Sequence, residues 1–305
     1  MKRLLVTGQG GFVGRTLTKM LDGEASPGGW ILADVPESWD LLDLRGTEAV
    51  VGAARADAVL HLAAQSWVPD SLRDPEATLN VNIIGTLHLL QALVRTGFHG
   101  RIVYAGSADV YGWTPDGDLP ITEDRLPVPR NPYAVSKLAA EALCRQWGIT
   151  ENIDVVLARP FNHIGPGQSD RFVISDFARQ VSEIKLGRRE PVVVTGDIDV
   201  TRDFTDVRDV VAAYFALLNT GVRGEVYNVC SGQSRSIRFL LETLAEIAGV
   251  AVTTRRDAAR LRPTEQRDMC GDPTKIRRAT AWQASIPIGD SLASMLTYWE
   301  NVAAA

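Results

Sequence analysis

Two side chains that could exchange a proton with a substrate lie four residues apart in the stretch Asn131-Pro132-Tyr133-Ala134-Val135-Ser136-Lys137. On a helix, this spacing puts Tyr133 and Lys137 on one face. A tyrosine titrates near about 10, and a neighbouring ammonium favours the phenolate, so we expect Lys137 to lower the pKa of Tyr133. The pair could then interconvert a carbonyl and an alcohol. The alternative is a surface Tyr–Lys contact on an amphipathic helix.

The local sequence predicts a helix that begins at this stretch. Asn131 can cap it, Pro132 suits its first position, and the following Leu138-Ala139-Ala140-Glu141-Ala142-Leu143 are good helix formers. Tyr133 and Lys137 would therefore lie in its first two turns.

A glycine-rich turn near the N-terminus provides a second chemical pattern. Residues 3–7 read as a buried strand, Gly8-Gln9-Gly10-Gly11-Phe12-Val13-Gly14 follows, and a helical pattern continues through Leu17 and Leu21. Glycines let a backbone approach a pyrophosphate, and a helix N-terminus supplies N–H groups and a positive dipole end. The alternative is a simple tight turn. Because the glycine-rich turn lies directly after a predicted strand, dinucleotide binding is favoured over this alternative.

The elements that would position these residues alternate between strand and helix. We predict strands at residues 30–33, 57–64, 101–105 and 154–159 and helices at residues 47–54 and 76–96. This order is typical of an α/β Rossmann-type, doubly wound parallel sheet. Ligands of such sheets bind beyond the strand carboxyl ends, where the Gly8 loop, Ala63, Ser107 and Phe161 fall.

Three polar residues within these elements have open roles. Asp34 follows the second strand and could bind the adenosine ribose of NAD. His61 lies in an apolar strand, so we expect a hydrogen-bonded core histidine. Asn82 lies in an apolar helix and needs a hydrogen-bond partner, so it is either structural or part of the site.

The C-terminal half is less regular and predicts a smaller mixed α/β domain for the substrate. We expect helices at residues 173–185, 207–218, 237–248 and 290–301, and strands at residues 192–194 and 226–230. The dinucleotide domain would span residues 1–164, with a returning segment near 196–230, and the substrate domain residues 165–305. Loop arginines Arg202 and Arg262 could clamp a diphosphate or be solvated charges.

Composition excludes several classes of protein. The 305 residues are 45% hydrophobic and 23% charged, with a net charge of −5, which argues against nucleic-acid binding. Cys144, Cys230 and Cys270 are far apart, so reduced thiols in the cytoplasm are expected. The N-terminus shows no signal-peptide pattern, no apolar run appears long enough to span a bilayer, and no metal site is predicted.

Several motifs occur together in one order and resemble those of the extended short-chain dehydrogenase/reductases that act on nucleotide sugars. The resemblance covers nearly the whole chain. Its motifs are Thr7-Gly8-x-x-Gly11-Phe12-x-Gly14, His61-Leu62-Ala63-Ala64, Ser107-x-x-Val110-Tyr111-Gly112, Tyr133-x-x-x-Lys137, Arg159-Pro160-x-Asn162, Arg202-Asp203-Phe204 and Arg262-Pro263-x-Glu265. Other runs are similar to family members that handle GDP-linked 6-deoxy sugars: Arg159-Pro160-Phe161-Asn162-His163-Ile164-Gly165-Pro166-Gly167-Gln168, Gly196-Asp197-Ile198-Asp199-Val200 and Tyr227-Asn228-Val229-Cys230-Ser231-Gly232-Gln233.

Ser107-Ala108-Asp109 favours a ketone reductase over a 4,6-dehydratase. Dehydratases of this family carry a Glu two residues after the catalytic Ser/Thr. Asp109 has a side chain one methylene shorter, and displacing a base by ~1 Å can cost about a hundredfold in rate. A ketone reductase needs no such base. An epimerase or dehydratase, which would retain and recycle NAD, stays open. A non-catalytic dinucleotide sensor is a remote alternative, since Ser107, Tyr133 and Lys137 are all present.

The resemblance implies hydride transfer from NADPH or NADH to the C4 ketone of a GDP-4-keto-6-deoxy-mannose substrate. Its implied catalytic residues are Ser107, Tyr133 and Lys137. Tyr133 would donate the proton, Ser107 would hydrogen-bond the C4 oxygen, and Lys137 would hold the nicotinamide ribose. Asp34 would repel a 2′-phosphate, whereas Arg15 or Arg45 could receive one. The C4 configuration of the product stays open.

The resemblance also implies the binding residues. Those for the cofactor are Gly8, Gly11, Phe12, Gly14, Asp40, Leu41, Leu62, Ala63, Tyr133, Lys137 and Phe161. Those for the substrate are Ser107, Asp109, Tyr133, Asn162, Arg202, Arg262 and Glu265. Asn82 would support the site through water or be a buried structural amide. A homodimer is implied, with the long helices containing Asn82 and Tyr133 forming a four-helix bundle, and no membrane or nucleic-acid partner is implied.

Overall fold

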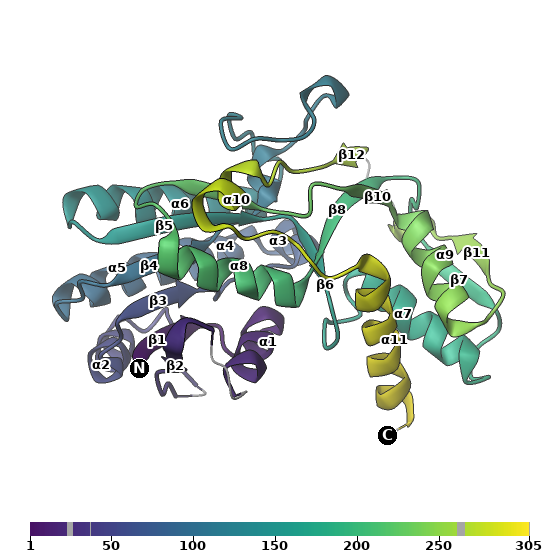
Figure 1. The fold of residues 1–305 in the computed structure, drawn as a ribbon, viewed down its shortest axis with the longest axis horizontal. Helices are drawn as coiled ribbons and strands as arrows, with labels where there is room; N and C mark the ends of the chain where they lie inside the picture. The colour runs from purple at the N-terminus through teal and green to yellow at the C-terminus, as the bar shows by residue number, and fades with distance from the viewer. Residues whose placement is uncertain (23–26, 37, 261–265, 305) are drawn as a thin grey trace.

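A six-stranded parallel sheet forms the centre of the larger lobe (Figure 1). The computed structural model describes residues 1–22, 27–36, 38–260 and 266–304. In spatial order the strands are β2 (Trp30–Leu32), β1 (Lys2–Thr7), β3 (Ala58–His61), β4 (Arg101–Ala105), β5 (Asp154–Pro160) and β9 (Val226–Val229). Every neighbouring pair is parallel, so the predicted doubly wound α/β fold is confirmed.

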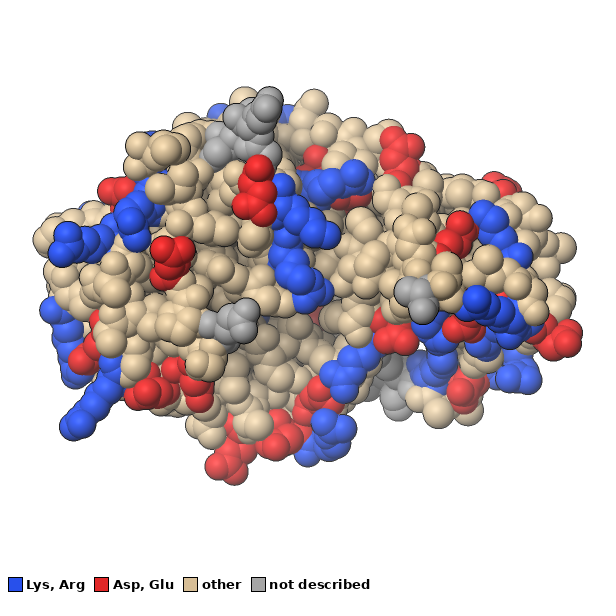
Figure 2. All heavy atoms as spheres, turned by 90° about the horizontal axis from the view of Figure 1, so that it is seen from below, with Lys and Arg blue, Asp and Glu red and all other residues tan. Residues whose placement is uncertain are grey.

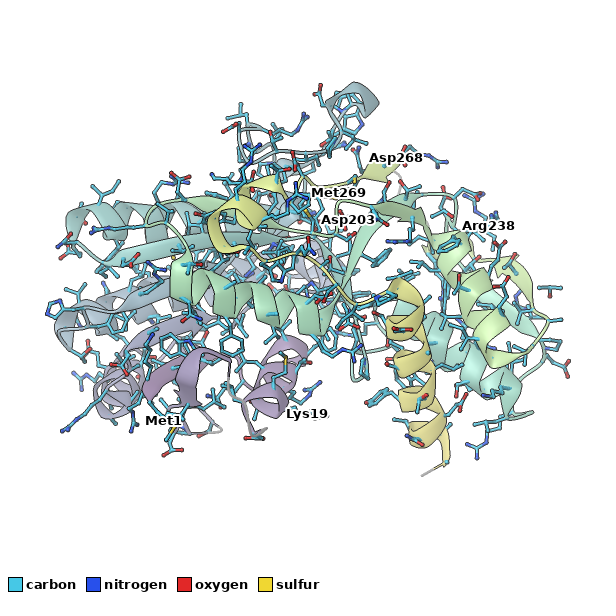
Figure 3. All side chains as sticks on the ribbon, viewed as in Figure 1. Met1, Lys19, Asp203, Arg238, Asp268 and Met269 are labelled. Carbon is cyan, nitrogen blue, oxygen red and sulfur yellow. The ribbon has the colours of Figure 1, made fainter. Side chains whose placement is uncertain are left out.

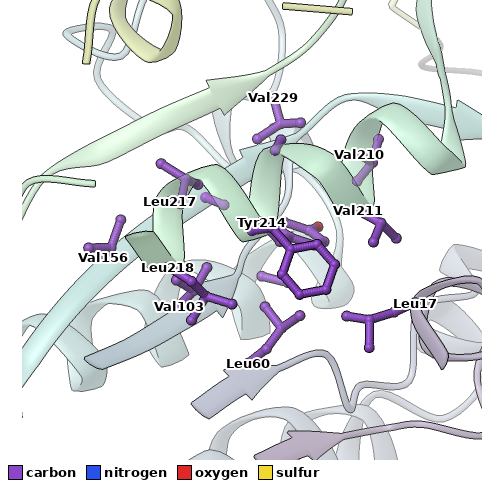
Figure 4. Packing of buried hydrophobic residues seen from close by; sticks show 14 of the residues in the cluster. Leu17, Leu60, Val103, Val156, Val210, Val211, Tyr214, Leu217, Leu218 and Val229 are labelled. Atoms are coloured by element: carbon purple, nitrogen blue, oxygen red, sulfur yellow. The ribbon is translucent and has the colours of Figure 1, made fainter. Parts of the chain in front are cut away.

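Helices cover both faces of this sheet because successive strand residues point to opposite sides. On β1, Leu4 and Val6 face one core cluster and Leu5 faces the other. The first cluster is covered by α1 (Phe12–Leu21) and α8 (Val207–Thr220), and the second by α2 (Leu44–Ala54), α5 (Gly85–Arg95) and α6 (Pro132–Thr150). Figure 4 shows Tyr214 of α8 packed over Leu60 beside Leu17.

The helix predicted at residues 76–96 is present, with a local change of pitch. It consists of α4 (Pro75–Leu79), a π-helical turn η2 (Asn80–Ile84) and α5. The stretch Pro75–Arg95 has 21 residues, and an 18-residue window within it has a mean hydropathy of 1.4, so by length and composition it could cross a membrane. The expectation that no apolar run is long enough was therefore wrong. Leu89, Leu90 and Leu93 nevertheless pack into the core, as in a core helix of a globular protein.

Among the described residues, a smaller lobe holds further helices and two small sets of strands. Its helices α7 (Val173–Lys185), α9 (Ile237–Ala248) and α11 (Ile288–Ala304) share a core with Phe177, Leu240 and Leu292. Strand β8 (Thr201–Asp206) pairs with three others, and a separate pair lies at the edge. These strands are β6 (Asn162–Ile164), β10 (Ser234–Ser236) and β12 (Asp268–Met269) beside β8, and β7 (Val192–Thr195) with β11 (Thr253–Arg256).

The chain returns to the larger lobe more than once. Within residues 196–230, α8 and β9 pack on the large sheet, whereas β8 belongs to the small one. A second return was not predicted: α10 (Thr274–Thr280) places Ile276 in the core of the larger lobe, and Trp282 follows it there. The division into residues 1–164 and 165–305 stays a prediction. Short helical elements complete the chain: η1 (Pro27–Gly29), α3 (Val68–Arg73), η3 (Ala108–Tyr111), η4 (Asp116–Asp118) and η5 (Ala258–Arg260).

Candidate active site

The glycine turn after β1 forms a close-packed cradle at the carboxyl end of the sheet. Gly8 has φ of +76°, and a Cβ there would lie 2.9 Å from the Cα of Ala63. A Cβ on Gly14 would lie 2.3 Å from the carbonyl oxygen of Gly8. The amide of Gly11 donates to that same oxygen at 3.0 Å. Larger residues at Gly8 and Gly14 would therefore displace the backbone of the turn.

The N-terminus of α1 fits an anionic group. Gly11 caps the helix without a side-chain hydrogen bond, and the first turn contains no acidic residue. The N–H groups at this helix end and the positive end of the helix dipole are therefore available. Gly10 beside them has open space where a Cβ would lie. This cradle fits the pyrophosphate of a dinucleotide.

Tyr133 and Ser107 come from two elements of the same connection, between β4 and β5, and lie in polar contact. Helix α6 begins as predicted, with Pro132 at its start and the Oδ1 of Asn131 accepting from the Ala134 amide at 2.8 Å. Ser107 caps η3, and its Oγ accepts from the Asp109 amide at 3.1 Å. Ser107 and Tyr133 are each 8% exposed. Two hydroxyl groups thus converge in a nearly buried place.

The expected lowering of the Tyr133 pKa was wrong. Burial raises the pKa of Tyr133 well above its ordinary value, the charge of Asp109 raises it further, and the contact with Ser107 opposes the rise. The ammonium of Lys137 is engaged with the end of β4, where Nζ donates to the carbonyl oxygen of Ala105 at 2.7 Å. It also lies 5.2 Å from the ring centroid of Tyr104. Spacing on a helix predicted the shared face but not these partners.

The pKa of Lys137 is also shifted, towards neutral pH. Its side chain is 4% exposed, and burial lowers its pKa to about 8 while Cys144 opposes the shift. A buried ammonium loses solvation, which disfavours the charged form. Lys137 is therefore a cation that can lose its proton just above neutral pH.

The core assignment of His61 is confirmed. Its Nδ1 lies 2.6 Å from Oγ1 of Thr7, and its Nε2 lies 2.9 Å from Oγ1 of Thr86. The ring is 2% exposed, and burial lowers its pKa to about 3, with the charge of Lys137 adding to the effect. His61 is therefore a neutral core residue with both ring nitrogens hydrogen-bonded.

Asn82 is a buried amide with hydrogen-bond partners inside the protein, whereas its support of the site through water stays a prediction. It lies in the π-helical turn η2, where its Oδ1 accepts from the Gln65 amide at 2.8 Å. Its Nδ2 donates to the Gln65 carbonyl at 3.0 Å and to Oγ of Ser136 at 2.8 Å. Ser136 in turn donates to the Tyr133 carbonyl at 2.7 Å. Asn82 therefore supports the first turn of α6 through direct hydrogen bonds.

The predicted cofactor residues outside the glycine turn line the same edge of the sheet. The amides of Leu62 and Ala63 both donate to Oγ1 of Thr7 at 3.1 Å. Phe161 is 3% exposed and packs 6.4 Å from the Tyr111 ring. Asp40 is exposed, and the carbonyl of Leu41 lies 2.9 Å from Nδ1 of His88. Phe12 stacks on His163 with ring centroids 6.1 Å apart. Cofactor contacts at these positions stay predictions.

Among the predicted substrate residues, Asn162 and Arg202 lie on strands of the smaller lobe, whereas Ser107, Asp109 and Tyr133 lie between β4 and β5. Asn162 is exposed at the start of β6, and Asp109 is partly buried beside Ser107. Arg202 on β8 donates to the carbonyls of Thr201 at 2.7 Å and Arg267 at 3.3 Å. Arg262 and Glu265 lie outside the described residues. Figure 2 shows a hollowed face between the lobes with Lys and Arg side chains on its rim.

Asp203, beside Arg202, was predicted only as part of a motif, yet its carboxylate connects β8 to the loop after β9. Its carboxylate is fully buried and accepts from the Ser231 amide at 2.8 Å, the Ser231 hydroxyl at 2.6 Å and the Gly232 amide at 2.9 Å. Figure 3 shows it near Met269 of β12. Asp203 therefore fixes β8, and with it Arg202, to the loop after β9.

The two candidate phosphate-binding arginines differ in their surroundings. The guanidinium of Arg15 donates to the Gly167 carbonyl at 3.2 Å and also bonds the Gly10 carbonyl, whereas Arg45 is exposed at the start of α2. Asp34 is exposed after β2. Within the part of the chain that the structure describes, no three His, Cys, Asp or Glu side chains gather as a metal site.

Comparison with known proteins identifies close relatives. Residues 37–295 match the family model described as GDP-mannose 4,6 dehydratase. The chain is 50% identical over 300 residues to GDP-6-deoxy-D-mannose reductase of Pseudomonas aeruginosa, covering 98% of each chain. It is 29% identical to GDP-6-deoxy-D-talose 4-dehydrogenase of Aggregatibacter actinomycetemcomitans, covering 90% of each. The solved structure of RMD from Pseudomonas aeruginosa complexed with NADPH superposes with a TM-score of 0.93 at 49% identity, covering 99% of this chain and 100% of that one.

Proposed function

The chain belongs to the GDP-mannose 4,6 dehydratase family, and we propose that it reduces the C4 ketone of GDP-4-keto-6-deoxy-D-mannose with NADPH or NADH. The product would be GDP-6-deoxy-D-mannose, also called GDP-D-rhamnose. The observation that carries this proposal is the full-length similarity to a reductase of that activity, in a chain that brings Ser107, Tyr133 and Lys137 together. The enzyme is thus an NAD(P)-dependent oxidoreductase.

Tyr133 is the proton donor of this reaction. A bound NADPH or NADH supplies the hydride. Reduction leaves a negative charge on the C4 oxygen, which needs a proton. Because burial raises the pKa of Tyr133, its hydroxyl keeps its proton at neutral pH and is ready to donate. Ser107 is in contact with that hydroxyl, so one carbonyl oxygen can lie against both groups while charge develops on it.

Lys137 acts after the proton has left Tyr133. A phenolate in this buried place is costly, and the family resemblance implies that the Lys137 ammonium stabilises it. Nζ is already oriented by the Ala105 carbonyl, which reduces the rearrangement needed during the reaction. By family resemblance, the same ammonium would bind the nicotinamide ribose.

The diphosphate of the substrate would bind on the smaller lobe. Arg202, together with Arg262 and Glu265, would hold the phosphates and ribose, and Asn162 would contribute from β6. Guanidinium groups suit phosphates because they donate paired hydrogen bonds. The burial of Asp203 supports this assignment, since it fixes the strand that carries Arg202.

Dehydration of GDP-mannose remains the second candidate because a carboxylate lies beside the proton donor. The charge of Asp109 acts on Tyr133, as a base near the substrate would. Ala108, the intervening residue, is 2% exposed and has no acid group. A dehydratase would release water from GDP-mannose without added reduced cofactor. A reductase would leave GDP-mannose unchanged.

A homodimer is part of the proposal. Only 44% of the most apolar 18-residue window of Pro75–Arg95 is buried within the chain, and on α6 the side chains of Val135 and Ile149 are 43% and 76% exposed. Packing these two helices against their copies as a four-helix bundle would cover this apolar surface. Sedimentation of Ile149→Glu should then show a monomer beside a wild-type dimer. We also propose a cytoplasmic location, which the free state of all three cysteines supports.

The experiment mixes purified protein, GDP-4-keto-6-deoxy-D-mannose and NADPH or NADH, and follows the absorbance of the reduced cofactor. Wild type should oxidise one cofactor per sugar. Tyr133→Phe should lose on the order of a hundred- to ten-thousandfold in kcat while binding NADPH normally, because only the proton donor is removed. Wild-type turnover in Tyr133→Phe would refute its role.

A further inference from the structure

Arg159 and Glu141 form a buried ion pair directly behind the catalytic residues. Nε of Arg159 donates to Oε2 of Glu141 at 2.9 Å, and Nη2 donates to Oε1 at 2.7 Å. Each side chain is only 5% exposed. The paired bonds fix the plane of the guanidinium as well as its position. Arg159 belongs to the end of β5, whereas Glu141 belongs to α6.

The same guanidinium stacks on Tyr111, the last residue of η3. Its Cζ lies 4.8 Å from the ring centroid. The Tyr111 hydroxyl donates to Oδ1 of Asn228 at 2.6 Å. Asn228 is held in turn by the Ile121 carbonyl at 2.9 Å and by Glu123, which accepts from its amide at 2.8 Å. The ring of Tyr111 is therefore fixed on both sides.

These contacts join the two elements that carry the reacting hydroxyls. Glu141 lies one helical turn after Lys137 and two turns after Tyr133 on α6. Tyr111 closes the short turn that begins at Ser107. Arg159 is thus in direct contact with both elements and with neither hydroxyl.

Stability alone is a poor explanation for this arrangement. Burying two charges removes their hydration, and apolar residues of similar volume often serve the fold equally well. Directional bonds, in contrast, fix the distance and angle between the groups they join. The feature that gains from such fixing is the relative placement of Ser107 and Tyr133.

We propose that Arg159 is a positioning residue, which holds α6 against η3 so that the hydroxyls of Tyr133 and Ser107 meet the same substrate oxygen. This inference rests on the proposed function. A displacement of about 1 Å between catalytic groups can cost about a hundredfold in rate. Arg159 would therefore affect kcat far more than the binding of either ligand.

A double variant separates positioning from folding. Arg159→Met with Glu141→Met removes both charges and keeps the interior filled, so its melting temperature should equal or exceed that of wild type. NADPH affinity should stay within about twofold, since no cofactor contact changes, whereas kcat should fall on the order of ten- to a hundredfold. The isotope effect on kcat with NADPH deuterated at the transferred position should rise, because hydride transfer becomes slower than product release.

A second ion pair, at the other end of β5, provides the control. Arg101 and Asp154 join the amino ends of β4 and β5, with Nε and Oδ2 2.9 Å apart. Their double substitution to Met should leave kcat and the isotope effect at wild-type values. Should the Arg159–Glu141 double variant not fold, Arg159→Lys replaces it, because Lys keeps the charge without the planar, paired geometry.

Each outcome decides between the two proposals. A wild-type protein that does not reduce the ketone refutes the proposed function. If wild type works, wild-type kcat and isotope effect in the folded double variant, or in folded Arg159→Lys, refute the positioning role alone. A slower folded variant with an increased isotope effect and unchanged NADPH affinity supports it.

Discussion

Nζ of Lys137 donates a 2.7 Å hydrogen bond to the carbonyl oxygen of Ala105, the last residue of β4. Ser107 follows two residues later, so the lysine of α6 is bonded to the strand that leads to the proposed catalytic serine. Lys137 therefore combines this structural bond with its proposed catalytic role.

The first prediction concerns the alkaline limb of activity. Burial lowers the pKa of Lys137 to about 8, so the ammonium is present below this pH and is lost above it. If this ammonium supports proton donation by Tyr133, as we propose, kcat/KM should fall as pH rises through about 8. Lys137→Met should be slow at all pH values and lack this limb. A wild-type profile that stays flat to pH 10 would contradict the role of the ammonium.

Gly14→Ala should damage the cofactor cradle. Its Cβ would lie 2.3 Å from the Gly8 carbonyl oxygen and 2.5 Å from that of Gln9, so the turn must shift. We expect NADPH affinity, measured by calorimetry, to fall at least about tenfold because the N–H groups that face the pyrophosphate move. Gly289→Ala, where nothing lies within 4 Å, is the control and should bind NADPH normally. Equal affinity in both variants would refute the cradle.

Arg202→Ala should change the KM for the nucleotide sugar but not the KM for the cofactor. If Arg202 holds the diphosphate of the nucleotide sugar, the substrate KM should rise on the order of tenfold or more while the cofactor KM stays nearly constant. Arg238 is the control, since it pairs with Asp199 at 2.8 Å on the outer side of the smaller lobe (Figure 3). Arg238→Ala should change neither constant. Equal increases in both KM values for Arg202→Ala would contradict a substrate clamp.

Acid pH should destabilise the fold through His61. Its pKa is lowered to about 3 in the folded protein from 6.5, so below pH 6.5 the unfolded chain binds a proton that the folded chain does not. Stability from this group is therefore complete above pH 6.5 and declines as pH falls. Between pH 7 and 5.5 the loss should be about 1 kcal/mol in urea unfolding.

A matched pair of variants isolates this contribution of His61 to the stability. His61→Gln should show a shallower pH dependence, by up to one proton, than wild type. His99→Gln, at an exposed position, should keep the wild-type dependence. The same pH dependence in His61→Gln and wild type would show that another group is responsible.

Local sequence predicted the start of α6 because the residues that determine it are close together in the chain. Asn131 and Pro132 specify a helix end through bonds that reach only a few residues. The alternation of apolar strands and amphipathic helices likewise predicted the parallel sheet. In contrast, β8 reads Thr-Arg-Asp-Phe-Thr-Asp, and its mainly polar pattern did not suggest a strand.

Properties of the site that depend on residues far apart in the sequence could not be predicted from the local sequence. The pKa of Tyr133 follows from burial and from Asp109, neither of which helix spacing reveals. The Arg159–Glu141 pair joins residues 18 positions apart, and Asp203 binds groups 28 and 29 positions away. Such partners are fixed by the folded chain rather than by local pattern.

Transfer of a label into the sugar tests the central claim most directly. The protein would be given GDP-4-keto-6-deoxy-D-mannose and NADPH deuterated at the transferred position, and the product would be examined by NMR. The account predicts deuterium at C4 of GDP-6-deoxy-D-mannose, with one NADPH oxidised per sugar. An unlabelled sugar, or loss of water from GDP-mannose without added cofactor, would contradict it.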